Sequence, residues 1–279
     1  MELRINIFYF SGTGFTERVA THLFDEFRTM GHEVNLYYIP TLISEGELSG
    51  IYEDCDVFGI MYPVHSFNAP EIVVKFAKDL PKADGKKSFI VKTAGEDAKV
   101  NHGSSDLLIR VLKKRGYLVN YEELVQMPSN FAVRNDDDSI RRIVRNADAL
   151  VKIIAEEIVK GRNKAYKKNV RQRAFVGASR VEWLGAHMIA KFHFKVNTDC
   201  NLCEFCIKNC PTKNISIKND KLKFGTKCTF CMRCIYTCPQ KAIHIKRPFS
   251  GIEIKDWFDI EELLKDNEKE PEAATKNLT

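Results

Sequence analysis

Eight of the nine cysteines in this 279-residue chain lie in two short runs near its C-terminal end. The first run, CNLCEFCIKNCP, covers residues 200–211, and the second run, CTFCMRCIYTCP, covers residues 228–239. Each run separates four cysteines by two, two and three residues and ends on a proline, which is the spacing of bacterial 4Fe-4S sites. The candidate metal ligands are therefore Cys200, Cys203, Cys206, Cys210, Cys228, Cys231, Cys234 and Cys238.

Disulfides and structural zinc are the other uses of crowded cysteines. The chain opens with MELRINIFYF, which predicts a buried strand and not a signal peptide. We therefore expect a cytoplasmic location, where disulfides are rare. Zinc sites usually take two ligand pairs separated by a long gap, whereas each run here has three ligands at equal short spacing. Two clusters are the preferred interpretation, with zinc as the alternative.

An internal repeat links the two runs. Residues 195–217, shifted by 28 positions, align with residues 223–245 and give eleven identities in 23 positions. Such self-similarity indicates the duplication of one small unit. The apolar residues near the cysteines are expected to shield the clusters; they are Leu202, Phe205, Phe230 and Ile235.

The first 160 residues predict a different architecture. Apolar strand candidates alternate with amphipathic helix patterns, which is typical of a parallel α/β sheet. The last helix pattern begins at Ile140, after Asp138 and Ser139, which can cap it. We expect a five-stranded parallel sheet with helices on both faces; its strands are 5–10, 34–39, 57–61, 89–91 and 118–125.

A candidate phosphate site lies between the first strand and the first helix, in the sequence SGTGFT. Backbone N–H groups at a helix start, together with hydroxyl side chains, bind phosphate. A P-loop would need lysine before the last hydroxyl, and a dinucleotide fingerprint would need glycine where Glu17 stands. An unrelated glycine turn is the remaining alternative. The candidate residues are Ser11, Gly12, Thr13, Gly14, Phe15 and Thr16.

This loop resembles the phosphate loop of flavodoxins, in which a hydroxyl residue and any residue precede Thr-Gly-any-Thr. The resemblance implies FMN, with the flavin ring between the loops that follow the third and fourth strands. The candidates after the third strand are Tyr62, Pro63, His65 and Phe67. Those after the fourth strand are Thr93, Ala94, Gly95 and Glu96. Residues 127–131, MPSNF, follow the fifth strand and could close over the site or simply connect elements.

Together, residues 1–160 and 195–247 resemble the flavodoxin–ferredoxin fusion proteins of anaerobic bacteria and archaea. The resemblance implies a small α+β ferredoxin domain with two 4Fe-4S clusters, whose fourth ligands cross over. Cys238 would complete the site of Cys200, Cys203 and Cys206, and Cys210 would complete that of Cys228, Cys231 and Cys234. The chain departs from the usual small residues between cysteines at Leu202, Glu204, Phe205, Met232 and Arg233.

Charge is distributed unevenly along the chain. The net charge is −5 over residues 1–157, +9 over 158–195, +7 over 196–247 and −5 over 248–279. We expect a basic, helical connector at 161–194 and an acidic tail at 248–279. No nucleic-acid motif accompanies the basic segments, so they favour an acidic redox partner protein or the acidic flavin domain itself. The most apolar later stretch, 175–194, contains three charged residues and predicts no membrane span. The oligomeric state is left open.

Three function classes follow. The first is an electron-transfer protein that passes single electrons between two clusters and FMN. The second is a flavin-dependent reductase of a small organic substrate, fed by the clusters. The third, a binding protein without redox turnover, fits poorly with a full set of cluster ligands. Because His65, His102 and Glu96 form no convincing catalytic dyad, electron transfer is preferred.

Overall fold

The computed structural model describes residues 2–46, 51, 55–96, 99–129, 135–166, 170, 172, 174–179 and 192–245. The expected acidic tail at 248–279, half of the connector and the end of the MPSNF segment lie outside these residues. No helix in the described ranges combines the length and the apolar character needed to cross a bilayer.

The N-terminal part contains one parallel sheet of five strands, as predicted. The strands are β1 (Arg4–Tyr9), β2 (Glu33–Tyr38), β3 (Val57–Pro63), β4 (Lys86–Ala94) and β5 (Tyr117–Gln126). Their order is β2-β1-β3-β4-β5, which is the strand order of flavodoxin-like sheets. The N-terminal part therefore has a flavodoxin-like fold.

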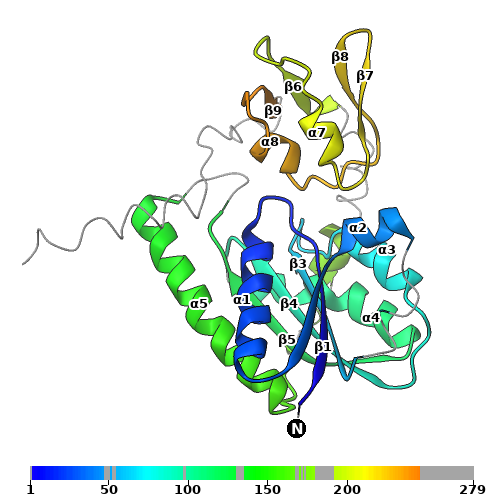
Figure 1. The fold of residues 1–279 in the computed structure, drawn as a ribbon, viewed down its shortest axis with the longest axis vertical. Coiled ribbons are helices and arrows are strands. Elements are labelled where there is room, and N and C mark those ends of the chain that lie inside the picture. The colour runs from blue at the N-terminus through cyan, green and yellow to red at the C-terminus, as the bar shows by residue number, and fades with distance from the viewer. Residues whose placement is uncertain are drawn as a thin grey trace, which may run out of the picture.

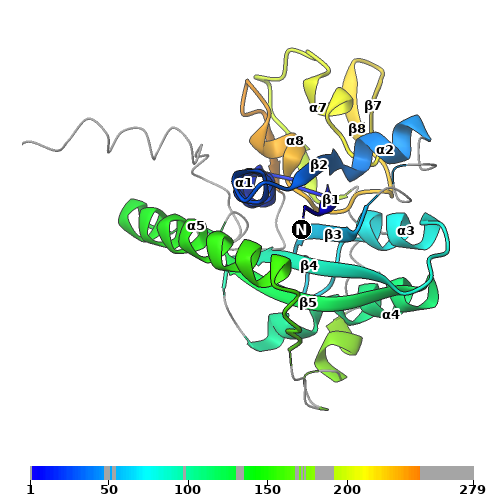
Figure 2. The ribbon, with the colours of Figure 1, turned by 60° about the horizontal axis from the view of Figure 1, so that its bottom comes forward.

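Helices cover both faces of the sheet (Figures 1 and 2). The helices α1 (Phe15–Thr29) and α5 (Asp137–Val159) pack on one face. The helices α2 (Ile39–Glu45), α3 (Glu71–Asp79) and α4 (Asp106–Lys114) lie on the other, and a 3₁₀ helix, η1 (Lys99–Ser105), precedes α4. Along β1, Ile5 and Ile7 enter the first core and Phe8 enters the second. A strand buried on both faces explains the nearly continuous apolar run of β1.

Three local expectations need correction. The cap of α5 is Asp136, whose side chain accepts a hydrogen bond from Ser139 N at 2.9 Å, because Asp138 already lies inside the first helical turn. Ile39 does not end β2 but begins α2, where Pro40 occupies a position that needs no N–H donor. The charged residue at the start of the connector, Lys164, is not helical and continues the sheet edge beside β5.

The connector contacts the flavodoxin-like part at two of its described segments, near Lys164 and near Val176. The backbone N–H of Lys164 donates to Asn120 O at 2.9 Å, and Glu122 N donates to Lys164 O at 2.8 Å. Residues 170, 172 and 174–179 are helical. Within this helix Val176 is buried, and a side chain at Gly103 of η1 would lie only 2.7 Å from it.

The second unit, residues 192–245, is built from two similar halves. Its elements are β6 (Phe194–Val196), α7 (Phe205–Lys208), β7 (Ile215–Lys218), β8 (Lys221–Phe224), α8 (Arg233–Tyr236) and β9 (Ile243–Ile245). Strand β6 pairs with β9, and β7 pairs with β8, both antiparallel. Positive φ angles recur 28 residues apart, at Glu204 and Met232 (61° and 60°). The sequence repeat is therefore also a repeat of backbone conformation.

The second unit lies over the carboxyl ends of the parallel strands (Figure 1). This is the edge of the sheet at which ligands bind in open α/β folds. The arrangement places both predicted chemical motifs at one end of the molecule.

Candidate functional site

The Ser11–Thr16 loop joins the carboxyl end of β1 to the start of α1. Gly14 occupies the N-cap position with φ of 96°, and its N–H donates to Ser11 Oγ at 3.1 Å. Within the described residues no side chain caps this helix. The first N–H groups of a helix lack intrahelical partners, and the helix dipole adds positive potential there. The loop can therefore accept an anion such as a phosphate.

A buried hydrogen bond ties this loop to the end of β4. The hydroxyls of Thr16 and Thr93 are 2.7 Å apart, and both residues are buried. Two segments that the sequence assigned to one site, 11–16 and 93–96, are thus in direct contact. The contact also fixes the rotamer of the Thr16 hydroxyl, which is one of the candidate phosphate donors.

The loop after β3 makes a tight turn. His65 and Asn68 exchange backbone hydrogen bonds of 3.0 and 2.9 Å, and the two residues between them, Ser66 and Phe67, have positive φ. Residues other than glycine rarely adopt this backbone conformation, and those that do are concentrated at functional sites. Phe67 meets the ring of Phe175 edge-on at 4.9 Å, so the connector buttresses this turn.

The loop after β4 is joined to the chain after β5. Met127 N donates to Ala94 O at 2.8 Å, and Gln126 Nε2 donates to Gly95 O at 3.4 Å. Glu96 is exposed, and its carbonyl accepts from Asn101 Nδ2 at 3.0 Å. The start of the MPSNF segment therefore lies beside the predicted ring-binding loop, as a closing segment requires.

Tyr62 and Pro63 belong to β3 and not to the loop that follows it. Tyr62 is fully buried in the core with Phe8, Ile60 and Leu108, and burial raises the pKa of its phenol well above the usual value. Its expected contact with a flavin ring stays a prediction, and packing is the role that the structure shows.

A buried ion pair supports the loop after β4 from below. Lys92 Nζ lies 2.6 Å from Glu122 Oε1, and neither side chain is exposed by more than 2%. The same ammonium donates to His102 O at 3.0 Å and to Ser105 Oγ at 3.1 Å, and Ser105 Oγ also donates to Glu122. A buried pair needs such extra hydrogen bonds to offset its desolvation. The network anchors η1 to β4 and β5.

The second cysteine run touches two of these loops. A Cβ built on Gly12 would lie 2.0 Å from the carbonyl oxygen of Cys231, so the two main chains are in contact. Arg233 Nη1 donates to Ser11 O at 3.4 Å, and His65 Nδ1 lies 3.1 Å from Thr229 O. The candidate metal site and the candidate phosphate site are therefore neighbours.

Tyr38, at the end of β2, completes this contact. The Arg233 guanidinium lies over its ring, 5.5 Å from the centroid, and its phenol donates to Ser11 O at 3.2 Å. Burial raises the pKa of the Tyr38 phenol to about 12, and the positive charge of Arg233 opposes that rise. The phenol is therefore a stable hydrogen-bond donor at neutral pH.

The first cysteine run encloses a small cavity of its own. Cys200, Cys203 and Cys206 line it together with Cys238 from the second run. Burial and the neighbouring thiols of Cys238, Cys200 and Cys203 raise the pKa of the Cys206 thiol to about 11. Phe205, expected to shield a cluster, lines this cavity but is 46% exposed. This side of the unit faces solvent.

The thiols of the second run are more deeply buried. Burial raises the pKa of Cys228 to about 11 and that of Cys231 to about 12. Burial, followed by the thiols of Cys231, Cys228 and Cys210, raises the pKa of Cys234 well above its usual value. Such thiols lose their protons at neutral pH only when a metal ion binds to the sulfur in place of the proton. Across the described residues, no three His, Cys, Asp or Glu side chains surround a position for a single metal ion.

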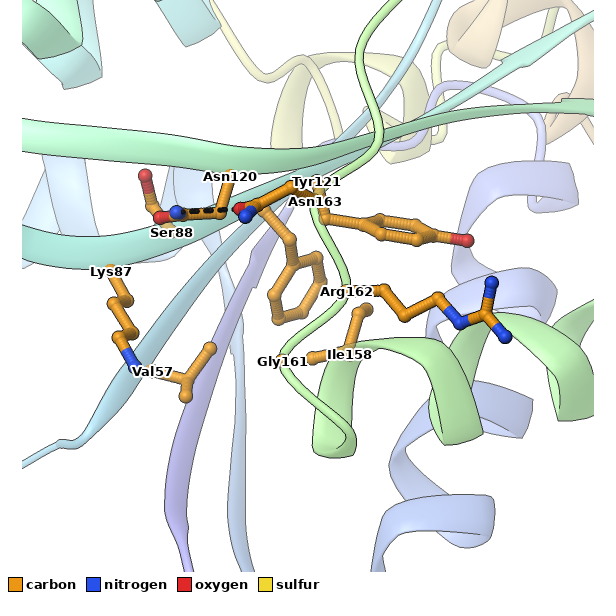
Figure 3. Close-up of a pocket in the computed structure, with 10 residues that line it drawn as sticks. Val57, Lys87, Ser88, Asn120, Tyr121, Ile158, Gly161, Arg162 and Asn163 are labelled. Carbon is orange, nitrogen blue, oxygen red and sulfur yellow. Dashed lines mark hydrogen bonds between the residues drawn. The ribbon is translucent and has the colours of Figure 1, made fainter.

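A separate pocket lies at the opposite edge of the sheet (Figure 3). It is formed by the N-terminal halves of β3, β4 and β5, by the end of α5 and by the residues that follow α5, and Asn120 and Asn163 are hydrogen-bonded across it at 3.0 Å. The side chains of Lys87 and Arg162 lie on opposite sides of it (Figure 3). It is remote from every loop that the sequence assigned to the flavin.

Comparison with solved structures returns flavodoxins and related proteins. An archaeal flavodoxin is 14% identical, with a TM-score of 0.38; the match covers 56% of this chain and 98% of that one. Flavodoxin 2 of Bacillus cereus is 18% identical over 55% of this chain and 99% of that one, with a TM-score of 0.39. The general stress protein 14 of Treponema denticola, solved with FMN, is 10% identical over 55% and 98%, with a TM-score of 0.40. No protein-family model and no curated protein matches the chain.

Sequence reasoning missed the residues that join the two units. Thr229, Tyr38 and the paired role of Gly12 and Cys231 were not anticipated, because they depend on contacts between distant segments. Arg233 did carry a signal, since it departs from the small residues usual between cluster cysteines. In the structure this charged side chain contacts Ser11 and Tyr38.

Proposed function

We propose that this protein is an iron–sulfur flavoprotein that transfers single electrons between two 4Fe-4S clusters and FMN. The observation that carries the proposal is the contact of the second cysteine run with the Ser11–Thr16 loop, through Gly12 and Arg233. FMN supplies one- or two-electron chemistry and the clusters supply one-electron chemistry. Two redox sites in one chain are useful to each other only when they are close.

The residues present fit FMN. The uncapped start of α1 and the hydroxyls of Ser11, Thr13 and Thr16 suit a phosphate without any lysine. The turn at Ser66 and Phe67 and the chain at Thr93–Glu96 both leave the carboxyl edge of the sheet, where they can flank a flavin ring.

The cysteine geometry fits two cubanes. The cavity that joins Cys238 to Cys200, Cys203 and Cys206 supports the crossed ligand set. The thiol of Cys210 is close enough to those of Cys231 and Cys234 to contribute to their raised pKa values, which supports the second ligand set. Each thiolate of a cubane binds a different iron, so the four sulfurs surround a cluster and not one ion.

An acidic redox protein is the external partner that this unit suits. Residues 192–245 contain nine lysine and arginine residues and three acidic ones, a net charge of 9 − 3 = +6. Eight of these basic residues are exposed lysines. Complementary charge accelerates the encounter of such partners. The pocket of Figure 3 lies at the wrong edge to serve a flavin-dependent reductase.

Anaerobic purification with flavin and iron analysis, followed by a redox titration, tests the proposal. We expect one FMN and about eight irons per chain. The titration should resolve both flavin and cluster transitions. Zinc in place of iron, or iron without flavin, would contradict it.

A further inference from the structure

The two cysteine runs have the same backbone but different neighbours. Across the 28-residue repeat, Asn201 corresponds to Thr229, Glu204 to Met232, and Phe205 to Arg233. In the first run Asn201, Glu204 and Phe205 are exposed. In the second run Thr229 and Met232 are buried and Arg233 is half-buried. Of these three, Thr229 and Arg233 contact the flavodoxin-like part, whereas Met232 packs in the core of the cysteine-rich unit itself.

The contact with the second run explains why residue 12 is a glycine. Its backbone does not adopt the left-handed conformation, so no torsional reason requires glycine there. A Cβ would instead lie 2.0 Å from Cys231 O and 2.9 Å from Cys231 Cβ, and the nearest of these atoms is main chain, which cannot swing away. The flavodoxin pattern accepts any residue at this position, so contact with the second run is what explains the glycine in this chain.

Two polar anchors flank the Gly12 contact. Arg233 donates to Ser11 O, and its guanidinium stacks over Tyr38. On the other side, Thr229 O lies 3.1 Å from His65 Nδ1, which can donate when that nitrogen carries the proton. One anchor engages the phosphate loop and the other engages the turn after β3. The second run therefore spans the two segments expected to hold opposite ends of FMN.

We propose, resting on the function proposed above, that the second run forms a fixed wall of the flavin site. Gly12 leaves the space for this contact, and Arg233 is a positioning residue that keeps the second run in place. The loop from Tyr9 to Thr16 contains no lysine or arginine. Arg233 therefore brings a positive charge to a phosphate loop that has none of its own. FMN affinity consequently depends on a residue of the cysteine-rich unit.

Matched variants of the full-length protein test this wall. Gly12→Ala is paired with Gly177→Ala, because an added Cβ at Gly177 meets nothing within 4 Å. Arg233→Ala and Arg233→Lys are paired with Lys221→Ala, which removes a positive charge from the exposed β8 strand. Each protein is assayed for iron, for FMN affinity by flavin fluorescence, and for hydrogen exchange in residues 11–14 and 228–236.

The expected results separate contact from charge. Arg233→Ala should weaken FMN binding about tenfold, the loss expected for one nearby charge, with partial recovery in Arg233→Lys. Gly12→Ala should accelerate hydrogen exchange in both segments while iron content stays unchanged. It should also slow flavin reduction by prereduced clusters at least about tenfold, because a displaced donor loses its alignment. Gly177→Ala and Lys221→Ala should match the wild type.

Two outcomes are decisive. If Gly12→Ala and Arg233→Ala match their controls in FMN affinity and exchange, the wall does not exist. If the wild-type protein binds no FMN, the proposed function fails instead. The exchange comparison between Gly12→Ala and Gly177→Ala then still reports whether the second run packs on the loop.

Discussion

The two cysteine runs share ligand spacing and backbone torsions, yet they meet different surroundings. The first run borders a cavity that faces solvent, whereas the second run packs its main chain against Gly12. Duplication therefore preserved the candidate metal ligands, and divergence of the residues between them placed each run on a different side of the unit. Cysteine spacing indicates the chemistry of each run, and the intervening residues determine which part of the molecule each run contacts.

The largest effect should come from the ligands that cross between the runs. Cys238→Ser should remove the outward-facing cluster, and Cys210→Ser should remove the one beside the phosphate loop, each leaving about four of eight irons. Iron analysis combined with electron paramagnetic resonance of the reduced proteins identifies which cluster remains. Cys55→Ser is the control, because this buried cysteine lies outside both runs and should retain all of the iron. Loss of the same cluster in both variants would contradict the crossed pairing.

A smaller effect should appear at the phosphate loop itself. Thr16→Leu removes a hydroxyl, leaves Thr93 without its 2.7 Å partner and crowds the loop. Because a hydrogen bond to a charged group contributes about 1.5–3 kcal/mol, loss of the Thr16 hydroxyl should lower FMN affinity about 10- to 150-fold. Thr13→Leu should weaken binding as well, by removing a phosphate donor. Equilibrium dialysis against FMN measures both variants.

Thr41→Leu is the matched control for these loop variants. Thr41 is exposed on α2, so the same substitution there should leave FMN affinity unchanged. Iron content should stay at the wild-type value in all three proteins, since the cysteines are untouched. Undiminished FMN binding by both Thr13→Leu and Thr16→Leu would place the phosphate elsewhere.

The N-terminal sheet could be predicted because its signals are local. The nearly continuous apolar run of β1 and the apolar stripe of α1 can both be recognised in short stretches of sequence. Tyr62 was assigned to a loop because the apolar run ends at Met61, but hydrogen bonds to β4 extend β3 by two residues. The tyrosine therefore keeps the strand's two-residue alternation and points into the core.

The candidate site divides along the same line. Cysteine spacing and the SGTGFT loop are short motifs with a direct chemical meaning, so the sequence alone names both as candidate sites. The contacts of Ser11 with Arg233 and of His65 with Thr229 join residues more than 160 positions apart. No local pattern encodes which surface a small unit will cover. Gly12 illustrates this limit, because the sequence places it in the candidate phosphate loop and only the structure shows its contact with Cys231.

Salt should affect electron transfer differently on the two sides of the cysteine-rich unit. The smaller effect is expected on the inner side, which packs against the phosphate loop. The inner contact consists of main-chain packing at Gly12 and direct hydrogen bonds of 3.1 and 3.4 Å, which ions in solution screen little. Flavin reduction by prereduced clusters of the same chain should therefore be nearly independent of ionic strength. The Debye length is about 10 Å at 0.1 M, so a steep dependence would require the two units to dock through long-range charge. Stopped-flow measurement across a salt series, at two protein concentrations, decides the point.

The outer side should behave in the opposite way toward an acidic electron-carrier protein. Its second-order rate should fall about tenfold or more as salt rises, because steering by exposed lysines is screened. Lys208→Glu, within the first run, should lower that rate at low salt and flatten its salt dependence. Lys152→Glu changes the charge equally on exposed α5 and should have little effect. Equal slowing by both variants would show that total charge, and not the first-run face, attracts the partner. A concentration-independent step that slows with salt would show instead that the second run leaves the phosphate loop between turnovers.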